Sequence, residues 1–168
     1  MKLLGVFEDR YWAKTQTKEI RYTARVFLHS MDDRFAFLSI KGEDGFGFRD
    51  HIETCGGGVE EGETFLAAAK REISEETGLV AHHFRLIGAV IDEYNLIERM
   101  TCSVYYVAET TKKSGSTDRT AEEKRLISEI VWLTAEETLS RLSTETSPIG
   151  MLIHQRDLSV FTELLTFI

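Results

Sequence analysis

Three glutamates near the middle of the chain have the residue type and the spacing to bind a divalent cation. Glu72, Glu75 and Glu76 lie at positions i, i+3 and i+4 of a predicted helix, so their side chains leave the same side of its last turns. Like charges at this spacing repel each other by roughly 0.2–0.5 kcal/mol per pair. The helix dipole costs each carboxylate about 0.3–1 kcal/mol more at a C-terminal end. A divalent cation removes both penalties, and hard carboxylate oxygens suit Mg²⁺ or Mn²⁺.

The helix that carries these glutamates is predicted over residues 64–77. Thr64 is the expected N-cap, and Gly78 is the expected left-handed residue just beyond the last turn. The glycines of residues 56–58 precede the helix, and we expect them to form a tight turn that brings the backbone close to a ligand. The expected buried stripe, partly opposite the glutamates, consists of Leu66, Ala69 and Ile73.

The segment that includes this helix resembles the Nudix box. The pattern is Gly57-x5-Glu63-x7-Arg71-Glu72-Ile73-Ser74-Glu75-Glu76-Thr77-Gly78-Leu79, and it agrees with the box at every specified position. At average residue usage a chance match has a probability of about 10⁻⁹ per starting position. The chain is therefore similar to the Nudix hydrolases. These enzymes use a divalent metal and water to cleave the diphosphate linkage of a nucleoside diphosphate joined to another moiety.

The resemblance implies roles for the matched residues. Glu63 and Arg71 would be the partners that hold the carboxylates in place. The expected metal ligands are, besides the backbone carbonyl of Gly56, the carboxylates of Glu72, Glu75 and Glu76. The expected cofactor is Mg²⁺ or Mn²⁺.

The general base is expected from one of two places. In the family it is the acid that follows the box arginine, here Glu72, or an acid from a later loop, for which Glu123 is the first candidate and Glu122 the second. The metal would neutralise the diphosphate and lower the pKa of a water, whose proton the base would take. Attack in line at one phosphorus would release two phosphorylated products. The sequence leaves open which phosphorus is attacked.

The entry to the box departs from the family pattern. Many members carry Trp-x-x-Pro-Gly-Gly there, whereas this chain has Ile52 in place of the aromatic residue and Cys55 in place of the proline. The acids are untouched, so hydrolysis is still expected, with a differently shaped substrate pocket. Cys55 could be a reactive thiol, but a small residue that fills a tight turn is the favoured interpretation.

Several further residues have one functional and one structural interpretation. Phe46, Phe48 and Tyr94 could stack on a base, or they could be ordinary packing residues near strand ends. His82 and His83 have no partner at metal-ligand spacing, and we interpret them as surface residues.

Composition and charge limit the partners of the protein. The 168 residues predict one domain, residues 1–168, and 42% apolar with 29% charged residues is typical of a globular protein. The net charge of −8 repels a long nucleic acid and leaves a small phosphorylated substrate as the expected partner. No apolar run approaches the ~20 residues of a membrane span. With two cysteines and an acidic start, we expect a cytoplasmic protein.

The pattern of elements predicts an α/β fold, a Nudix-like α/β/α sandwich with a mixed central β-sheet. Two strands, residues 20–30 and 34–40, should form a hairpin, and two further helices should begin at Thr134 and near Pro148. Other strands are expected at residues 86–94, 101–108 and 130–133. Loops are expected at residues 41–49 and 110–120.

Three functions remain open from the sequence. The first is hydrolysis of a nucleotide sugar, dinucleotide or nucleoside triphosphate. The second is an isopentenyl-diphosphate isomerase-like activity, which the intact metal set disfavours. The third is a binding module that recognises a nucleotide without cleaving it. By resemblance, a homodimer is also expected.

Overall fold

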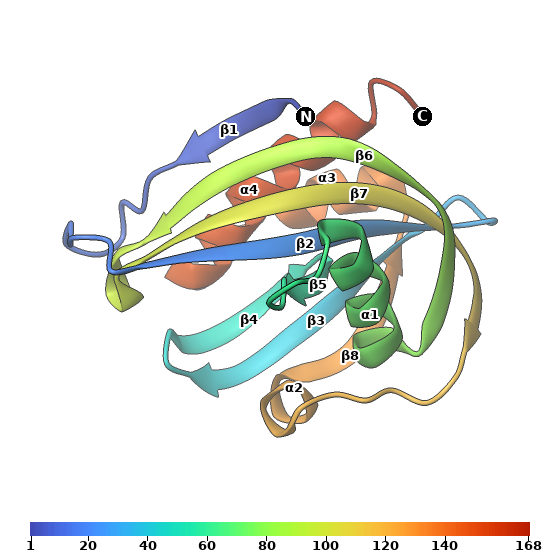
Figure 1. The fold of residues 1–168 in the computed structure, drawn as a ribbon, viewed down its shortest axis with the longest axis horizontal. Coiled ribbons are helices and arrows are strands. Elements are labelled where there is room, and N and C mark those ends of the chain that lie inside the picture. The colour runs from blue at the N-terminus through green and yellow to red at the C-terminus, as the bar shows by residue number, and fades with distance from the viewer.

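The computed structural model describes residues 1–111 and 115–168, and its elements alternate between strands and a few helices (Figure 1). In chain order they are β1 (Leu3–Phe7), β2 (Glu19–Ser30), β3 (Phe35–Asp44), β4 (Gly47–Glu53), β5 (Cys55–Gly58), α1 (Phe65–Thr77), β6 (Leu79–Tyr94), a 3₁₀ turn (Asn95–Ile97), β7 (Arg99–Ser114), α2 (Ala121–Leu126), β8 (Ile127–Leu133), α3 (Ala135–Leu142) and α4 (Pro148–Leu164).

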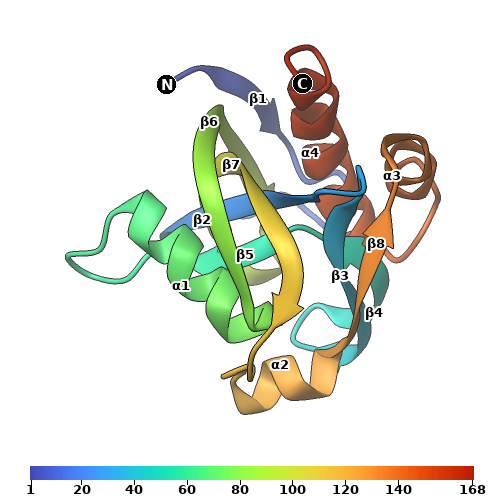
Figure 2. The same ribbon diagram turned by 90° about the vertical axis from the view of Figure 1, so that its right-hand side faces the viewer.

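In the described part of the chain, eight strands form one mixed sheet with the order β1-β6-β7-β2-β3-β4. β5 joins this sheet by pairing with β2, and β8 joins it by pairing with β3. The β1–β6 and β2–β7 pairs are parallel, and the other pairs are antiparallel. β2 and β3 pair only next to their turn, Leu28 with Ala36 and His29 with Phe35. Beyond that point the two halves of the sheet diverge (Figure 2).

Helices cover both faces of the sheet, which confirms the predicted α/β/α sandwich. Because successive side chains of a strand point to opposite faces, β2 contributes to two cores. Ala24, Val26 and Leu28 belong to the core that includes Ala69 and Ile73 of α1. On the other face, Phe27 lies 5.3 Å, ring centre to ring centre, from Phe161 of α4. Each large apolar side chain buried in this way contributes about 1.5–3 kcal/mol.

The predicted hairpin and helix starts are confirmed. The Thr64 hydroxyl accepts a hydrogen bond from the Ala67 amide at 3.1 Å, and Gly78 is left-handed with φ 66°. Thr134 and Glu137 form a capping box at the start of α3. Pro148 occupies the first turn of α4, where its fixed φ fits the helix.

Both predicted loops are shorter than expected. Residues 41–49 are not a glycine-rich loop, because β3 continues to Asp44 and β4 begins at Gly47. Gly47 has φ 88°, which lets the chain reverse between the two strands. Of the predicted loop at residues 110–120, Thr110 already belongs to β7. Residues 112–114 lie outside the described residues.

The remaining strands lie where they were predicted, but each is longer than predicted. The strands at residues 86–94 and 101–108 extend to the bounds of β6 and β7, because their polar ends still form the antiparallel ladder. The strand at residues 130–133 begins earlier, at Ile127. Among the described residues, no helix is both long and apolar enough to cross a membrane.

A buried polar group lies between β4 and α4. His51 is 3% exposed, and its Nε2 lies 3.3 Å from Nη2 of Arg49. Burial lowers the pKa of His51 to about 4, and Arg49 and His154 act in the same direction. Glu53 and Asp157 raise it. His51 is therefore neutral in the folded protein at physiological pH.

This burial predicts a loss of stability in acid. In the unfolded chain His51 titrates near 6.5, so between pH 6.5 and 4 the unfolded state binds a proton that the folded state does not. Stability is present above pH 6.5, and it falls by up to about 3 kcal/mol as the pH drops to 4. Urea unfolding of His51→Gln at several pH values should show a shallower dependence than the unaltered protein. The exposed His82→Gln serves as the control and should keep the original slope.

Candidate active site

Ala69 and Ile73 of the expected stripe are buried, but two of the three clustered glutamates are buried as well. The buried positions of α1 include Glu72 and Glu76, whereas Leu66 is 37% exposed. The side of the helix that carries Glu72 and Glu76 faces β5, and β5 presents glycines there. The absence of side chains at the three glycines of β5 makes room for two carboxylates at the helix–sheet boundary.

The glycines of β5 form a strand rather than the predicted turn, and two of them are required by close approach. Gly56 has φ 129°, and a Cβ there would lie 2.1 Å from the carbonyl oxygen of Ala24. A Cβ at Gly57 would lie 2.5 Å from Oε1 of Glu72. Pairing of β5 with β2 fixes this extended conformation, so the sequence motif marks a strand that must pass both a neighbouring backbone and a carboxylate.

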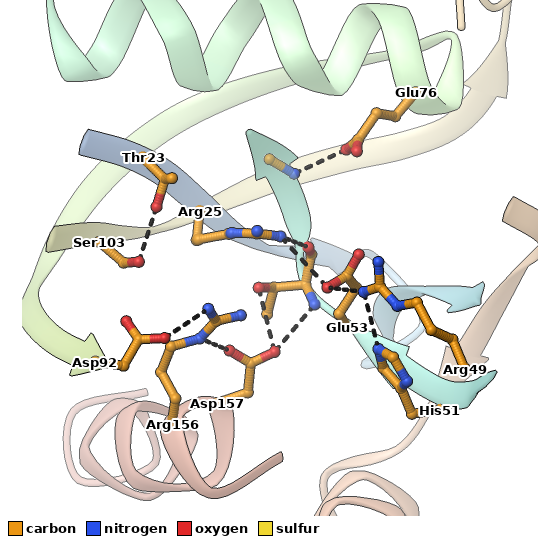
Figure 3. A network of polar contacts seen from close by, with 12 residues as sticks. Thr23, Arg25, Arg49, His51, Glu53, Glu76, Asp92, Ser103, Arg156 and Asp157 are labelled. Atoms are coloured by element: carbon orange, nitrogen blue, oxygen red, sulfur yellow. Dashed lines mark hydrogen bonds and ion pairs between the residues drawn. The ribbon is translucent and has the colours of Figure 1, made fainter. Parts of the chain in front are cut away.

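Glu76 is held by the backbone of β5. The Gly56 amide donates a hydrogen bond to Oε2 of Glu76 at 2.8 Å (Figure 3). Burial raises the pKa of Glu76 well above its usual value, and the hydrogen bond from Gly56 opposes this effect. Burial also raises the pKa of Glu72, against the attraction of Arg71. Burial thus disfavours the ionised form of both carboxylates, although Glu72 also has the guanidinium group of Arg71 as a partner.

Arg71 connects the box acids. Its Nε and Nη2 donate to the two carboxylate oxygens of Glu63 at 3.1 and 3.0 Å, a bidentate pair. Its Nη1 donates to Glu72 at 2.9 Å and to Glu75 at 3.0 Å, and its Nη2 also donates to the Gly58 carbonyl at 2.9 Å. Glu63 and Arg71 thus lie where partners that position the acids are expected.

The structure brings Glu123, rather than Glu75, next to the two buried glutamates. One carboxylate oxygen from each of Glu72, Glu76 and Glu123 lies within 4.8 Å of the other two. Glu75 is about a third exposed and is bound by Arg71. Glu122 also lines the same cavity but is largely exposed beside Arg125. Three converging oxygen ligands, two of them buried, fit a divalent cation such as Mg²⁺ or Mn²⁺.

The short helix α2, which the sequence analysis missed, positions Glu123. Thr120 is its N-cap, and Glu123, at the third helical position, accepts a hydrogen bond from the Thr120 amide at 2.7 Å. The spacing Thr120-x-x-Glu123 is itself a capping-box signal. Six residues are too few to show helical periodicity, so the capping box is the sequence feature that indicates this helix.

A cavity of about 490 Å³ opens from the acids toward α4. Its outer end is lined by box residues and α2, and its inner end by side chains from β2, β4 and α4. The inner polar residues are Arg25, Arg49, Glu53 and Arg156, none of which the sequence analysis selected. The alternation Arg21-x-Thr23-x-Arg25 places polar groups on one face of β2. This pattern is the feature of the sequence that indicates a polar surface there.

The model of the NUDIX domain matches residues 19–152 of the chain. The chain belongs to the Nudix family. Nudix enzymes generally use divalent metals, and the acidic cluster fits that requirement. No curated protein matches the chain.

Solved structures share the Nudix fold at low sequence identity. A NUDIX hydrolase from Nitrosomonas europaea is 16% identical with a TM-score of 0.63, over 87% of this chain and 88% of that one. The MutT protein from Methanosarcina mazei Go1 is 17% identical with a TM-score of 0.62, over 91% and 99%. The NUDIX domain of Shewanella oneidensis NrtR, in complex with ADP ribose, is 15% identical with a TM-score of 0.62, over 91% and 90%. The matched domain, with hydrolases among its neighbours, supports a Nudix-type hydrolase.

The other residues singled out from the sequence fall in different places. Phe46 and Tyr94 line the cavity, whereas Phe48 is 59% exposed. Cys55 is fully buried, and burial raises the pKa of its thiol, which keeps it protonated and unreactive. His83 is exposed and lies 2.9 Å from the Glu109 carboxylate.

Arg71→Lys should destabilise the Nudix domain. One ammonium group cannot replace the fork that binds Glu63 bidentately and reaches Glu72, Glu75 and the Gly58 carbonyl. We expect a loss of about 2–3 kcal/mol in urea unfolding. The control Arg125→Lys changes an exposed arginine and should stay within about 0.5 kcal/mol of the unaltered protein. Equal losses in both variants would contradict a special role of Arg71.

Proposed function

We propose that this Nudix protein hydrolyses the diphosphate linkage of a small nucleotide derivative with the help of Mg²⁺ or Mn²⁺. The supporting observation is the convergence of Glu72, Glu76 and Glu123 on the lining of a cavity of about 490 Å³. This volume lies within the ~300–1,000 Å³ typical of small-molecule sites. The ADP ribose bound to the NrtR domain is a ligand of the proposed chemical class.

The proposed roles follow from the contacts of each acid. Glu72 and Glu76 would hold the divalent ion, with Glu75 and the Gly56 carbonyl as further ligands in the expected set. When bound, the ion would neutralise diphosphate charge and favour ionisation of a water. Glu123, on a separate element, would take the proton of that water. Glu63 would keep Arg71 oriented so that Glu72 stays in place.

We also propose that residues 1–168 form one domain. α4 runs beyond the matched residues 19–152, and its Phe161 packs against Phe27 of the sheet. Removal of this helix would expose the core that contains Phe27.

A panel of substrates tests the proposed activity. Nucleotide sugars, dinucleotides and nucleoside triphosphates are incubated with Mg²⁺ or Mn²⁺, and the phosphorylated products are identified. The protein should cleave at least one class, and Glu76→Gln should lower kcat by orders of magnitude without unfolding. Tight binding of one compound with no turnover of any would favour the nucleotide-binding module instead.

Glu123→Gln separates a base from a metal ligand. If Glu123 is the base, kcat should fall by about 10²–10⁴-fold while the affinity for Mn²⁺, measured by calorimetry, changes little. The control Glu122→Gln alters a neighbouring exposed acid of α2 and should leave kcat nearly unchanged. A fall in Mn²⁺ affinity with Glu123→Gln would make it a ligand, and a fall in kcat below about tenfold would assign the base to another acid.

Gly57→Ala should impair the site with little effect on the fold. Gly57 has no left-handed φ, so alanine fits the backbone, but its Cβ would displace the Glu72 carboxylate. We expect stability to change by less than about 1 kcal/mol and kcat/KM to fall at least about tenfold. Gly115→Ala adds a methyl group at ordinary contact distance and is the control. Unchanged kcat/KM would show that Glu72 can move without consequence.

A further inference from the structure

The inner end of the cavity is lined by side chains that have no role in the proposed diphosphate hydrolysis. Its charged residues come from β2, β4 and α4, and in Figure 3 they lie away from Glu76 of α1. One wall is apolar and the floor is charged. A substrate whose diphosphate lies at the acids would place its remaining moiety against these two surfaces.

The apolar wall suits a flat ring. The ring centres of Phe46 and Tyr94 lie 5.9 Å apart in an edge-on arrangement, and Ile149 and Ile153 of α4 continue the same cluster. All four side chains line the cavity. Aromatic and branched aliphatic side chains of this kind bind planar heterocycles by stacking and burial of apolar area.

The charged floor has a carboxylate between two guanidinium groups. An oxygen of Glu53 lies 3.9 Å from Nη1 of Arg25 and 3.6 Å from Nη2 of Arg49, so neither contact is a close hydrogen bond (Figure 3). Burial raises the pKa of Glu53, but the attraction of Arg49 and Arg25 outweighs this effect and the pKa falls to about 2. Glu53 is therefore ionised and can only accept hydrogen bonds.

The guanidinium groups around Glu53 have hydrogen-bonding capacity to spare. Within the described part of the chain, the buried Nε atoms of Arg25 and Arg49 and the Nη2 atom of Arg156 have no hydrogen-bond partner. Arg156 is 2% exposed, is held by Asp157 and Asp92, and still lines the cavity. Because buried N–H groups are normally paired, these donors point to a ligand with acceptor atoms.

The order of the groups defines the complementary ligand. A floor that reads donor, acceptor, donor matches a ring edge that reads acceptor, donor, acceptor. Among planar heterocycles this is an imide edge, a ring N–H between two carbonyl groups. Positive and negative side chains are nearly balanced here, since Arg25, Arg49 and Arg156 face Glu53, Asp44, Asp157 and Asp92. The balance favours a neutral polar group over a further phosphate.

We infer that the inner end of the cavity binds a base with an imide edge, of the uracil or thymine type. Glu53 accepts the ring N–H, the guanidinium groups of Arg25 and Arg49 donate to the flanking carbonyls, and Phe46 and Tyr94 contact the ring. This inference deepens the proposed function and rests on it for the identity of the site, since it names the base carried by the diphosphate substrate. Glu53 then determines specificity rather than chemistry.

Binding of nucleoside monophosphates tests the inference without hydrolysis, because these compounds have no diphosphate bond. Calorimetry on the intact protein compares uridine, cytidine and N3-methyluridine 5′-monophosphates. We expect uridine monophosphate to bind at least about tenfold more tightly than the other two, since both lack the N–H that Glu53 accepts. Equal affinities for the three ligands would overturn the inference and leave the substrate panel unaffected. Conversely, no turnover of any compound in that panel would contradict the proposed hydrolase activity, even if uridine monophosphate still bound more tightly than the other two ligands.

Two variants assign the preference to the floor and to the wall. Glu53→Gln should reduce the uridine-to-cytidine ratio to near one, whereas the control Glu136→Gln on α3 should keep it. Phe46→Leu should weaken both ligands by a similar factor and preserve the ratio. An unchanged ratio in folded Glu53→Gln would overturn the role of Glu53. If Glu53→Gln does not fold, the unaltered protein still tests the inference. Equal affinities for uridine and N3-methyluridine monophosphates would then contradict a role of the ring N–H.

Discussion

The close approach of β5 to the last turns of α1 is the constraint on which the site depends. A strand of glycines lets the backbone pass within reach of Glu72 and Glu76, and the Gly56 amide supplies the hydrogen bond that a buried Glu76 needs. β5 can occupy this place only because β2 pairs with β3 next to their turn alone. Farther from the turn, β2 pairs with β5 instead. The divergence of the sheet and the burial of the acids are therefore one arrangement.

Charge around the acids is arranged unevenly. Arg71 faces Glu63, Glu72 and Glu75, whereas Glu76 has a backbone amide in place of a cation. Arg25, Arg49 and Arg156 lie at the other end of the cavity and are largely matched by acids of their own. One cavity thus has an end where three carboxylates converge and an end where, among the described residues, guanidinium N–H groups lack acceptors. A ligand carrying both a metal-bound diphosphate and a carbonyl-rich ring would satisfy both ends.

Local signals in the sequence predicted what depends on local structure. The caps Thr64 and Gly78, the box itself and the capping box at Thr134 follow from short-range rules, and they are correct. The burial of Glu72 and Glu76 could not be predicted from helical spacing, because it depends on which strand lies opposite. The position of Glu123 depends on the path of α2, and the pairing of Arg25 with Glu53 joins β2 to β4. Such contacts are set by tertiary structure, and hydrophobic periodicity does not report them.

The carboxylate of Glu123 takes part in two interactions. Its Oε2 accepts the hydrogen bond that closes the first turn of α2, and the same side chain contributes to the acidic cluster. A ligand that draws this carboxylate inward competes with the Thr120 amide, a cap worth about 1 kcal/mol. By thermodynamic linkage, occupancy of the cluster and integrity of the first turn of α2 are then coupled with equal strength in both directions. The shortest α-helix among the described residues thereby becomes an indicator of what the cavity holds.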